Sequence, residues 1–196
     1  IAFAGTTVVT TSLTTAAKGY NVTFAGTTSL AGAPVFLNTG NVTFGGTTVL
    51  SSGATITGGT ATAVSLAGTI VSSGAFNIGA SPATTTITTG TNLSLNSATA
   101  ASTFAGKVVL ASGDNLNLLG VGTLTLSGDS STTGVVGNIS VLNGTLNVTG
   151  QIGAASLSTA TNGTISGAGG TIGTLTVNTG TVAPGGTLKT GAVTLN

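Results

Sequence analysis

The phrase Asn-Val-Thr-Phe-x-Gly-Thr-Thr-x-Leu occurs twice, at Asn21–Leu30 and at Asn41–Leu50, and its two copies begin 20 residues apart. Self-similarity at a period of roughly 20 residues is the sequence signature of a stack of small equivalent units. Each unit of such a stack buries its apolar face on the next unit, so the product is a rod. This spacing therefore sets the architecture that we expect for the whole chain.

The phrase continues in weaker form beyond these two copies. Its Phe-Ala-Gly core also begins at Phe3 and Phe104, and Leu66 begins the variant Leu-Ala-Gly. Successive copies lie 20 to 22 residues apart, or 38 residues apart where one unit between them has diverged. A period that drifts by a few residues fits a solenoid whose corners differ in length, and we expect roughly ten coils of about 19–22 residues.

Short β-type runs alternate with glycine-centred turns along the chain. In these runs apolar residues occupy every second position, which is typical of half-buried strands. Helix signals are scarce, and the best helical candidate is Ala98–Ala105. The sequence therefore predicts an all-β fold, a right-handed parallel β-helix (β-solenoid) with short strands in each coil. The clearest predicted strands are Val22–Phe24, Val42–Phe44, Leu93–Leu95, Leu116–Leu118, Leu124–Leu126, Leu146–Val148 and Leu175–Val177.

The same architecture accounts for the scarcity of charge. The chain has 3 Lys+Arg and 2 Asp+Glu among 196 residues, so 3% of it is charged, whereas an average globular chain has about 25%. Stacked coils place equivalent side chains about 4.8 Å apart, and like charges at that distance repel, whereas threonine packs and hydrogen-bonds on threonine. A neutral surface therefore follows from the fold and does not by itself indicate a special role.

Asparagine and proline recur where the coils are expected to turn. Asparagine tolerates left-handed backbone conformations and forms side-chain ladders in stacked strands. Proline cannot serve a central ladder and belongs in corners. We therefore expect left-handed corners or ladders at Asn21, Asn41, Asn143 and Asn162, and corners at Pro34, Pro82 and Pro184.

Composition excludes several classes of protein. Abundant Val, Ile and Thr with little charge argue against a disordered chain, and no run of about 18 apolar residues is present to form a transmembrane helix. A net charge of +1 offers no attraction for nucleic acid or anionic lipid. The chain has no cysteine, so disulfides and zinc–thiolate sites are excluded. Residues 1–196 show no domain boundary, and we expect a single solenoid segment of a longer chain.

The stretch Gly173–Leu188 resembles the passenger-associated repeat of bacterial autotransporters, whose pattern is Gly-Thr-Leu-x-Val-x-x-Gly-x-Val-x-Pro-Gly-Gly. The remainder is similar to autotransporter passenger and filamentous-haemagglutinin-type solenoids in composition and coil length. The resemblance implies a right-handed parallel β-helix, secretion, display on the bacterial surface, and adhesion as the commonest role. The near absence of Asp and Glu departs from the family. The matching residues are Gly173, Thr174, Leu175, Val177, Gly180, Val182, Pro184, Gly185 and Gly186.

The residue inventory argues against catalysis. General acid–base chemistry needs His, Glu, Asp, Lys, Tyr or Cys with a tuned pKa, and the only carboxylate side chains are Asp114 and Asp129. They are fifteen residues apart, so they could lie on neighbouring coils and flank a glycosidic bond, as the two carboxylates of a glycosidase do. We favour the alternative that both are solvent-exposed residues of turns. We therefore predict no catalytic, cofactor-binding or metal site. Calcium repeats with acidic ligands are absent, and Gly120 begins no phosphate loop because no helix follows it.

Two further patterns concern surface function. Regular Thr-x-Thr rows on a flat solenoid face can match an ice lattice, but the pairs here do not recur at one phase, so ice binding is a less favoured alternative. The pairs are Thr55–Thr57, Thr60–Thr62, Thr84–Thr86, Thr86–Thr88, Thr123–Thr125 and Thr174–Thr176. Asn-x-Ser/Thr glycosylation sequons, frequent by chance in such a composition, begin at Asn21, Asn41, Asn92, Asn138, Asn143, Asn147 and Asn162.

The sequence thus favours a non-enzymatic structural rod at the bacterial cell surface or outside the cell, a stalk or passenger segment of an adhesin. The expected partners are a host or matrix ligand, or further copies of the chain, because an exposed coil end is an open sheet edge that templates pairing. A self-assembling subunit of an extracellular filament or surface layer is the alternative. Neither nucleic acid nor membrane insertion is expected.

Overall fold

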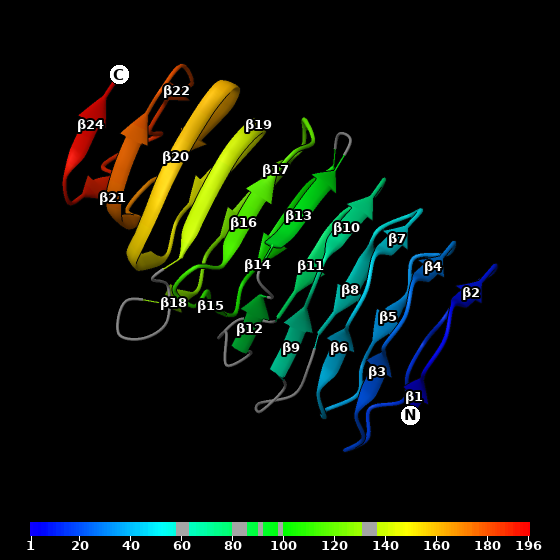
Figure 1. Ribbon diagram of the computed structural model, residues 1–196. Coiled ribbons are helices and arrows are strands. Elements are labelled where there is room, and N and C mark those ends of the chain that lie inside the picture. The colour runs from blue at the N-terminus through cyan, green and yellow to red at the C-terminus, as the bar shows by residue number, and fades with distance from the viewer. Residues whose placement is uncertain (58–62, 80–85, 90–91, 98–99, 131–136) are drawn as a thin grey trace.

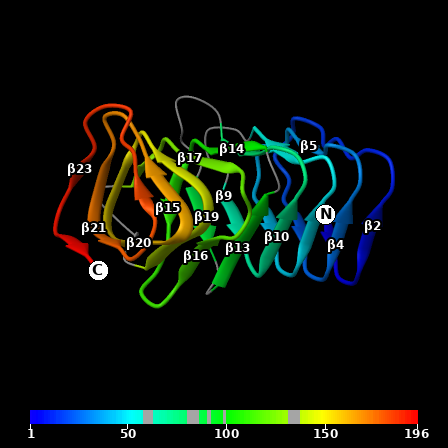
Figure 2. The same ribbon diagram turned by 90° about the horizontal axis from the view of Figure 1, so that it is seen from above.

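Parallel strands stack into a β-solenoid in the computed structural model, which describes residues 1–57, 63–79, 86–89, 92–97, 100–130 and 137–196. The coils follow one another from the N-terminus to the C-terminus, and the two ends lie at opposite ends of the stack (Figure 1). The view from above shows the same succession of coils along the rod (Figure 2). The predicted all-β parallel solenoid is confirmed, with about 8 turns rather than ten.

The strands line three faces of the rod. The first face carries β1 (Ala2–Phe3), β3 (Val22–Phe24), β6 (Val42–Phe44), β9 (Ala63–Leu66), β12 (Thr86–Thr89) and β15 (Lys107–Val109), and β18 (Asp129–Ser130) lies beside β15. The second face carries β2 (Thr7–Val9), β4 (Thr28–Leu30), β7 (Thr48–Leu50), β10 (Thr69–Ser72), β13 (Asn92–Ser97), β16 (Asn115–Leu118) and β24 (Val193–Leu195). The third face carries β5 (Val35–Phe36), β8 (Ala54–Ile56), β11 (Phe76–Ile78), β14 (Ala101–Phe104), β17 (Thr123–Leu126) and β22 (Thr181–Val182).

Towards the C-terminus the strands lengthen and run round the corners. β19 (Asn138–Val148) pairs with both β16 and β17, so one strand joins the second and third faces. β20 (Gln151–Ser166) and β21 (Thr171–Val177) continue this wrapping, and β21 pairs with β23 (Lys189–Thr190) as well as with β24. Short strands separated by turns were expected everywhere, and this expectation is wrong for the last coils.

The predicted strands are otherwise confirmed, because alternating burial along each run matches the alternating sequence. β3 and β6 have the predicted bounds, and their apolar residues are buried while the threonine between them is half-exposed. The other predicted runs lie within β13, β16, β17, β19 and β21. The weak helical candidate is wrong in its described part, because Ala101–Phe104 forms strand β14 with alternating burial.

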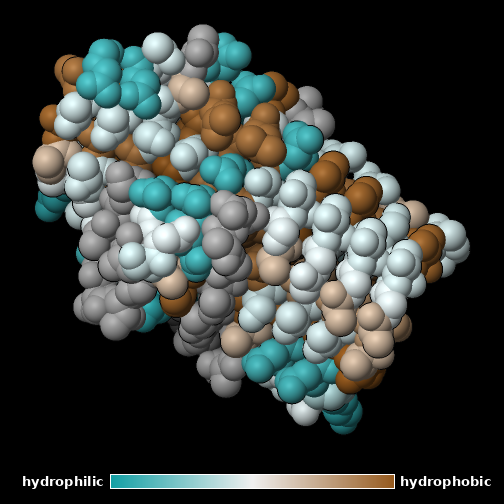
Figure 3. Space-filling view, in the orientation of Figure 1, coloured by the Kyte–Doolittle hydropathy of each residue, from teal (hydrophilic) through white to brown (hydrophobic). Residues whose placement is uncertain are grey.

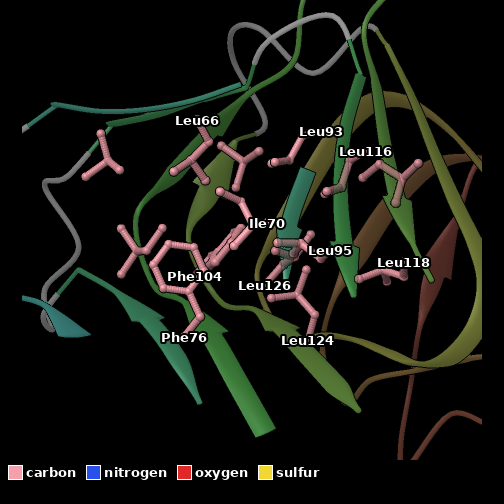
Figure 4. Packing of buried hydrophobic residues seen from close by; sticks show 14 of the residues in the cluster. Leu66, Ile70, Phe76, Leu93, Leu95, Phe104, Leu116, Leu118, Leu124 and Leu126 are labelled. Carbon is pink, nitrogen blue, oxygen red and sulfur yellow. The ribbon is translucent and has the colours of Figure 1, made fainter. Parts of the chain in front are cut away.

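Identical phrases stack in register, which builds the interior from columns of like side chains. Val22 pairs with Val42, and Phe24 pairs with Phe44. Phe3 stacks on Phe24 with ring centroids 4.8 Å apart, and Phe36 meets Phe24 and Phe44 edge-on from the third face. Further along the rod, leucine, isoleucine and phenylalanine from all three faces fill the interior (Figure 4). One continuous apolar core therefore runs through the stack.

The asparagine ladder predicted for the repeated phrase is confirmed. Asn21 Oδ1 accepts a hydrogen bond of 2.9 Å from the Asn41 N–H, and Asn41 Oδ1 accepts one of 3.2 Å from the Ala63 N–H. Asn143 lies in register with Asn162 of the next coil, but its side-chain oxygen accepts the Gly144 N–H instead of a group of that coil. The left-handed corner conformation is wrong, because among the described residues only glycines have positive φ.

One corner contains a buried polar network that satisfies four backbone groups. Asn38, which is 0% exposed, donates from Nδ2 to the carbonyls of Tyr20 and Gly40. The Thr15 hydroxyl donates to Asn38 Oδ1 and accepts from the backbone N–H groups of Leu37 and Asn38. Because an unmade hydrogen bond in the interior costs about 1–3 kcal/mol, this network fixes the corner.

Two of the three prolines confirm the corner prediction. Pro34 lies directly before β5, where its carbonyl accepts the Thr55 N–H of the next coil. Pro184 lies between β22 and β23. Pro82 lies outside the described residues. No described segment is a helix of the length and hydropathy that crossing a membrane requires.

Candidate functional surface

The second face presents a row of small neutral polar side chains in register. In this row, called the hydroxyl–amide row, the hydroxyls of Ser140 and Ser158 lie 3.4 Å apart. Beside it, Asn138 Nδ2 donates to Asn115 Oδ1 at 3.2 Å. The row runs through Ser94, Asn117, Ser140, Ser158, Thr176 and Thr194. Each coil from β13 to β24 thus contributes neutral donors and acceptors at an equivalent position.

The space-filling view agrees with this chemistry. Residues of intermediate hydropathy form pale rows across the coils towards the N-terminal end, and strongly hydrophilic residues gather only in small groups (Figure 3). The larger exposed apolar side chains include Leu119 and Leu142, which are 40% and 43% exposed. The visible surface is therefore a mosaic of neutral polar and apolar groups.

A hollow of about 260 Å³ interrupts the second face towards the C-terminal end. Thr159 pairs with Val141 on one side and with Val177 on the other, and the small Ala160 that follows it lines the hollow together with Leu142 and Asn178. The short side chain leaves the space open. The lining consists of Asn117, Ser140, Val141, Leu142, Ser158, Thr159, Ala160 and Asn178.

This lining can bind a neutral polar molecule by hydrogen bonds but offers no acid–base chemistry. None of its side chains titrates near neutral pH, and serine or threonine without a neighbouring base is a poor nucleophile. Thr159 adds an unusual feature, because it is 1% exposed and its Oγ1 has no hydrogen-bond partner among the described residues. The hydroxyl occupies an interior column between Val141 and Val177.

A second cavity is far smaller, about 20 Å³, and exposed Asn96 and half-exposed Gly120 belong to its lining. Buried Ser72 and Ser102 line it together with apolar residues such as Ile70 and Leu95. Both hydroxyls are used, because Ser72 Oγ donates to the Gly74 carbonyl and Ser102 Oγ accepts the Phe76 N–H. This volume is that of about one water molecule, so the cavity is a packing defect rather than a ligand site.

The two aspartates lie on successive coils, as the sequence allowed, but in different elements. Asp114 lies in the turn before β16, and its Oδ2 accepts the Ala111 N–H at 3.2 Å. Asp129 is exposed at the start of β18, where it pairs with Gln151 of the next coil. The turn role predicted for Asp114 is confirmed, whereas Asp129 belongs to a strand.

The described Thr-x-Thr pairs lack a common phase, as predicted. Thr125 and Thr55 share one column of the third face, through Thr103 and Asn77, so Thr55–Thr57 is offset by two positions from Thr123–Thr125. Thr174–Thr176 lies on the second face. The pairs Thr60–Thr62, Thr84–Thr86 and Thr86–Thr88 fall, wholly or in their side chains, outside the described residues. The third face nevertheless holds a threonine column, formed by Thr123, Thr145, Thr164 and Thr181.

The passenger-like stretch spans two faces and a corner. Leu175 and Val177 lie in β21, Val182 lies in β22, and Pro184 to Gly186 form the exposed turn that follows. The hollow was missed because it depends on which residues of unequal coils align. Comparison with protein-family models, with curated proteins and with solved structures found no match to this chain.

Proposed function

We propose that this chain is a segment of the shaft of an extracellular rod at the bacterial cell surface, the stalk or passenger of an adhesin, and that it has no catalytic activity. The observation that carries this proposal is the parallel pairing of strands from coil to coil over the described residues, interrupted only by register shifts between Val141 and Asn143 and between Ile152 and Ser156. The family resemblance of Gly173–Leu188 supports the location and the adhesive context.

The function of such a shaft is geometric. Each coil adds about 4.8 Å to the rod, so eight turns give about 40 Å of reach. Backbone hydrogen bonds between coils run along the rod axis and resist extension, while the apolar core resists bending and proteolysis because local opening exposes buried side chains. The neutral surface limits non-specific attraction to charged molecules.

A self-assembling filament or surface-layer subunit is the second candidate. Leu195 of the last coil pairs with Val177 in an interior column and is 76% exposed. A further coil stacked there would bury it, as the preceding coils bury their equivalents. In this alternative that coil belongs to a second copy of the chain. Ice binding receives less support, because the described Thr-x-Thr pairs share no common phase along the rod.

One experiment on location and one on assembly test the proposal. Antibodies against the chain, applied to intact bacteria that produce it, should label the cell exterior. Sedimentation velocity of the purified chain should give an elongated monomer. Labelling only after lysis would contradict the shaft at the cell surface, and concentration-dependent growth into ordered fibres would favour the assembly subunit.

A further inference from the structure

Two Asn-Gly-Thr triplets lie directly over one another in successive coils. Asn143 pairs with Asn162, Gly144 with Gly163, and Thr145 with Thr164. The dipeptide Asn-Gly is chemically fragile, because glycine leaves the backbone nitrogen unhindered and that nitrogen can attack the preceding side-chain carboxamide. The fold therefore contains the same fragile dipeptide twice, in the same column and with the same following residue.

The local conformation of the two copies differs. Gly144 has φ of +71°, and its N–H donates to Asn143 Oδ1 at 3.1 Å. This bond holds the side-chain oxygen of Asn143, and with it the carboxamide, beside the amide nitrogen that follows it. Gly163 is not among the glycines with positive φ, and exposed Asn162 makes no such side-chain bond among the described residues. A register shift between Val141 and Asn143 accompanies the difference.

We propose that Asn143 is a site of spontaneous covalent modification, and that the fold makes it more reactive than Asn162. Hydroxide removes the amide proton of Gly144, and the nitrogen attacks Cγ of Asn143. A new C–N bond forms between the Gly144 nitrogen and Cγ, the bond from Cγ to Nδ2 breaks, and Nδ2 takes a proton from water and leaves as ammonia. Hydroxide is thereby regenerated, and the product is a five-membered succinimide. Water then opens the ring at either carbonyl and leaves an aspartyl or an isoaspartyl residue. No enzyme or oxidant takes part.

The preference for Asn143 rests on proximity. Holding two reacting groups close together lowers the entropy that they lose on reaching the transition state. For well-oriented pairs this raises the reaction rate by orders of magnitude. Both dipeptides have the same chemistry in an unfolded chain, so any difference between them in the folded chain comes from conformation. Asn162 thus serves as the control that the protein itself provides.

Either product weakens the coil. An aspartyl product introduces a charge into a column where Asn162 lies directly below. An isoaspartyl product inserts Cβ into the main chain and shifts Thr145 and Leu146 relative to Thr164 and Ile165. Gly144 leaves little room to adapt, because a Cβ built on it would overlap the carbonyl oxygens of Gly120 and Gly122.

The test compares the two sites in one sample. The folded chain is incubated at mildly alkaline pH, digested, and mapped by mass spectrometry with electron-transfer fragmentation, which separates aspartyl from isoaspartyl products. A parallel sample is incubated in urea. We expect conversion at Asn143 to be roughly fivefold or more faster than at Asn162 in the folded chain, and equal at the two sites in urea.

Equal rates in the folded chain, a faster rate at Asn162, or conversion at Asn143 only in urea would overturn the proposal. Asn143→Gln gives a matched variant, because its longer side chain must close a larger and less favoured ring. It should lose conversion at position 143 and keep that at Asn162. If this variant does not fold, the ratio of the two sites in the native chain still decides the question.

Discussion

The rings of Phe24 and Phe44, one coil apart, lie parallel with centroids 5.2 Å apart and an interplanar angle of 5°. Both side chains are at most 1% exposed. We expect Phe44→Ala to lower the free energy of unfolding by about 3–5 kcal/mol, because it removes buried apolar area and leaves a cavity beneath Phe24. Urea unfolding followed by circular dichroism measures the change. Phe3→Ala at the partly exposed end of the same column is the control, and an equal loss there would contradict the column as the source of stability.

The network around Asn38 predicts a dependence of stability on pH in a single variant. In Asn38→Asp, an oxygen replaces Nδ2 beside the carbonyls of Tyr20 and Gly40. Burial and the facing oxygens raise the pKa of the introduced carboxyl above its unfolded value of about 3.9. The folded state then binds more protons than the unfolded state, so the free energy of unfolding falls as pH rises through the interval between the two values.

Urea unfolding of Asn38→Asp at acidic and neutral pH checks this sign. The protonated carboxyl can donate to a carbonyl, whereas the carboxylate cannot, so the variant should be more stable under acidic conditions. Asn38→Ala is the matched control, because it should lose about 1–3 kcal/mol from unpaired buried groups at either pH. The same pH profile in both variants would show that the carboxyl is not buried as the structure places it.

Gly32 tests how closely successive coils approach at a corner. A Cβ built on Gly32 would overlap the carbonyl oxygen of Thr11 in the preceding coil, whereas a Cβ on Gly5 meets nothing within 4 Å. We expect Gly32→Ala to destabilise by about 1–3 kcal/mol through overpacking. Gly5→Ala should be neutral or stabilising by about 0.4–1 kcal/mol, because alanine restricts the unfolded chain. Thermal and urea unfolding compare the two, and a tolerated Gly32→Ala would mean that this corner is looser than described.

Thr159 offers a substitution that should stabilise the rod. Its Oγ1 is buried and has no hydrogen-bond partner in the part of the chain that the structure describes, so Thr159→Val replaces a desolvated hydroxyl by a methyl group of similar size. We expect a gain of about 1 kcal/mol, the lower end of the penalty for an unsatisfied buried group. Thr123→Val on the half-exposed outer surface should change stability by less, about 0.5 kcal/mol. A loss of stability in Thr159→Val would reveal a hydrogen bond to that hydroxyl.

How much the sequence predicts depends on how faithfully a segment repeats. Val22–Phe24 and Val42–Phe44 were predicted with the observed bounds, because copies of one phrase occupy equivalent positions and alternate strictly. The ladder from Asn21 to Asn41 follows from the same identity. Where the phrase is unchanged, the number of residues between its copies directly gives the pairing of residues between neighbouring strands.

The features that sequence inspection missed lie where the coils stop being equivalent. Thr15 and Asn38 are 23 residues apart and belong to no repeated phrase, so their pairing emerges only when the corner closes. β19 and β20 pass the corners without a break, and the shift between Val141 and Asn143 changes which residues align. The hollow beside Ala160 depends on that alignment. Sequence periodicity therefore predicts the structure of coils with equal corners, whereas side-chain packing determines the structure where the corners differ in length.

The register between Phe24 and Phe44 also bears on how a gene for such a protein can change. An insertion or deletion of a single amino acid within a strand would exchange the inward and outward side chains of that strand up to the next corner. Duplication of one whole coil, by contrast, leaves all pairings between strands intact. Recombination between near-identical gene segments should therefore lengthen or shorten the shaft in whole steps, so that reach varies among strains while diameter and surface chemistry stay constant.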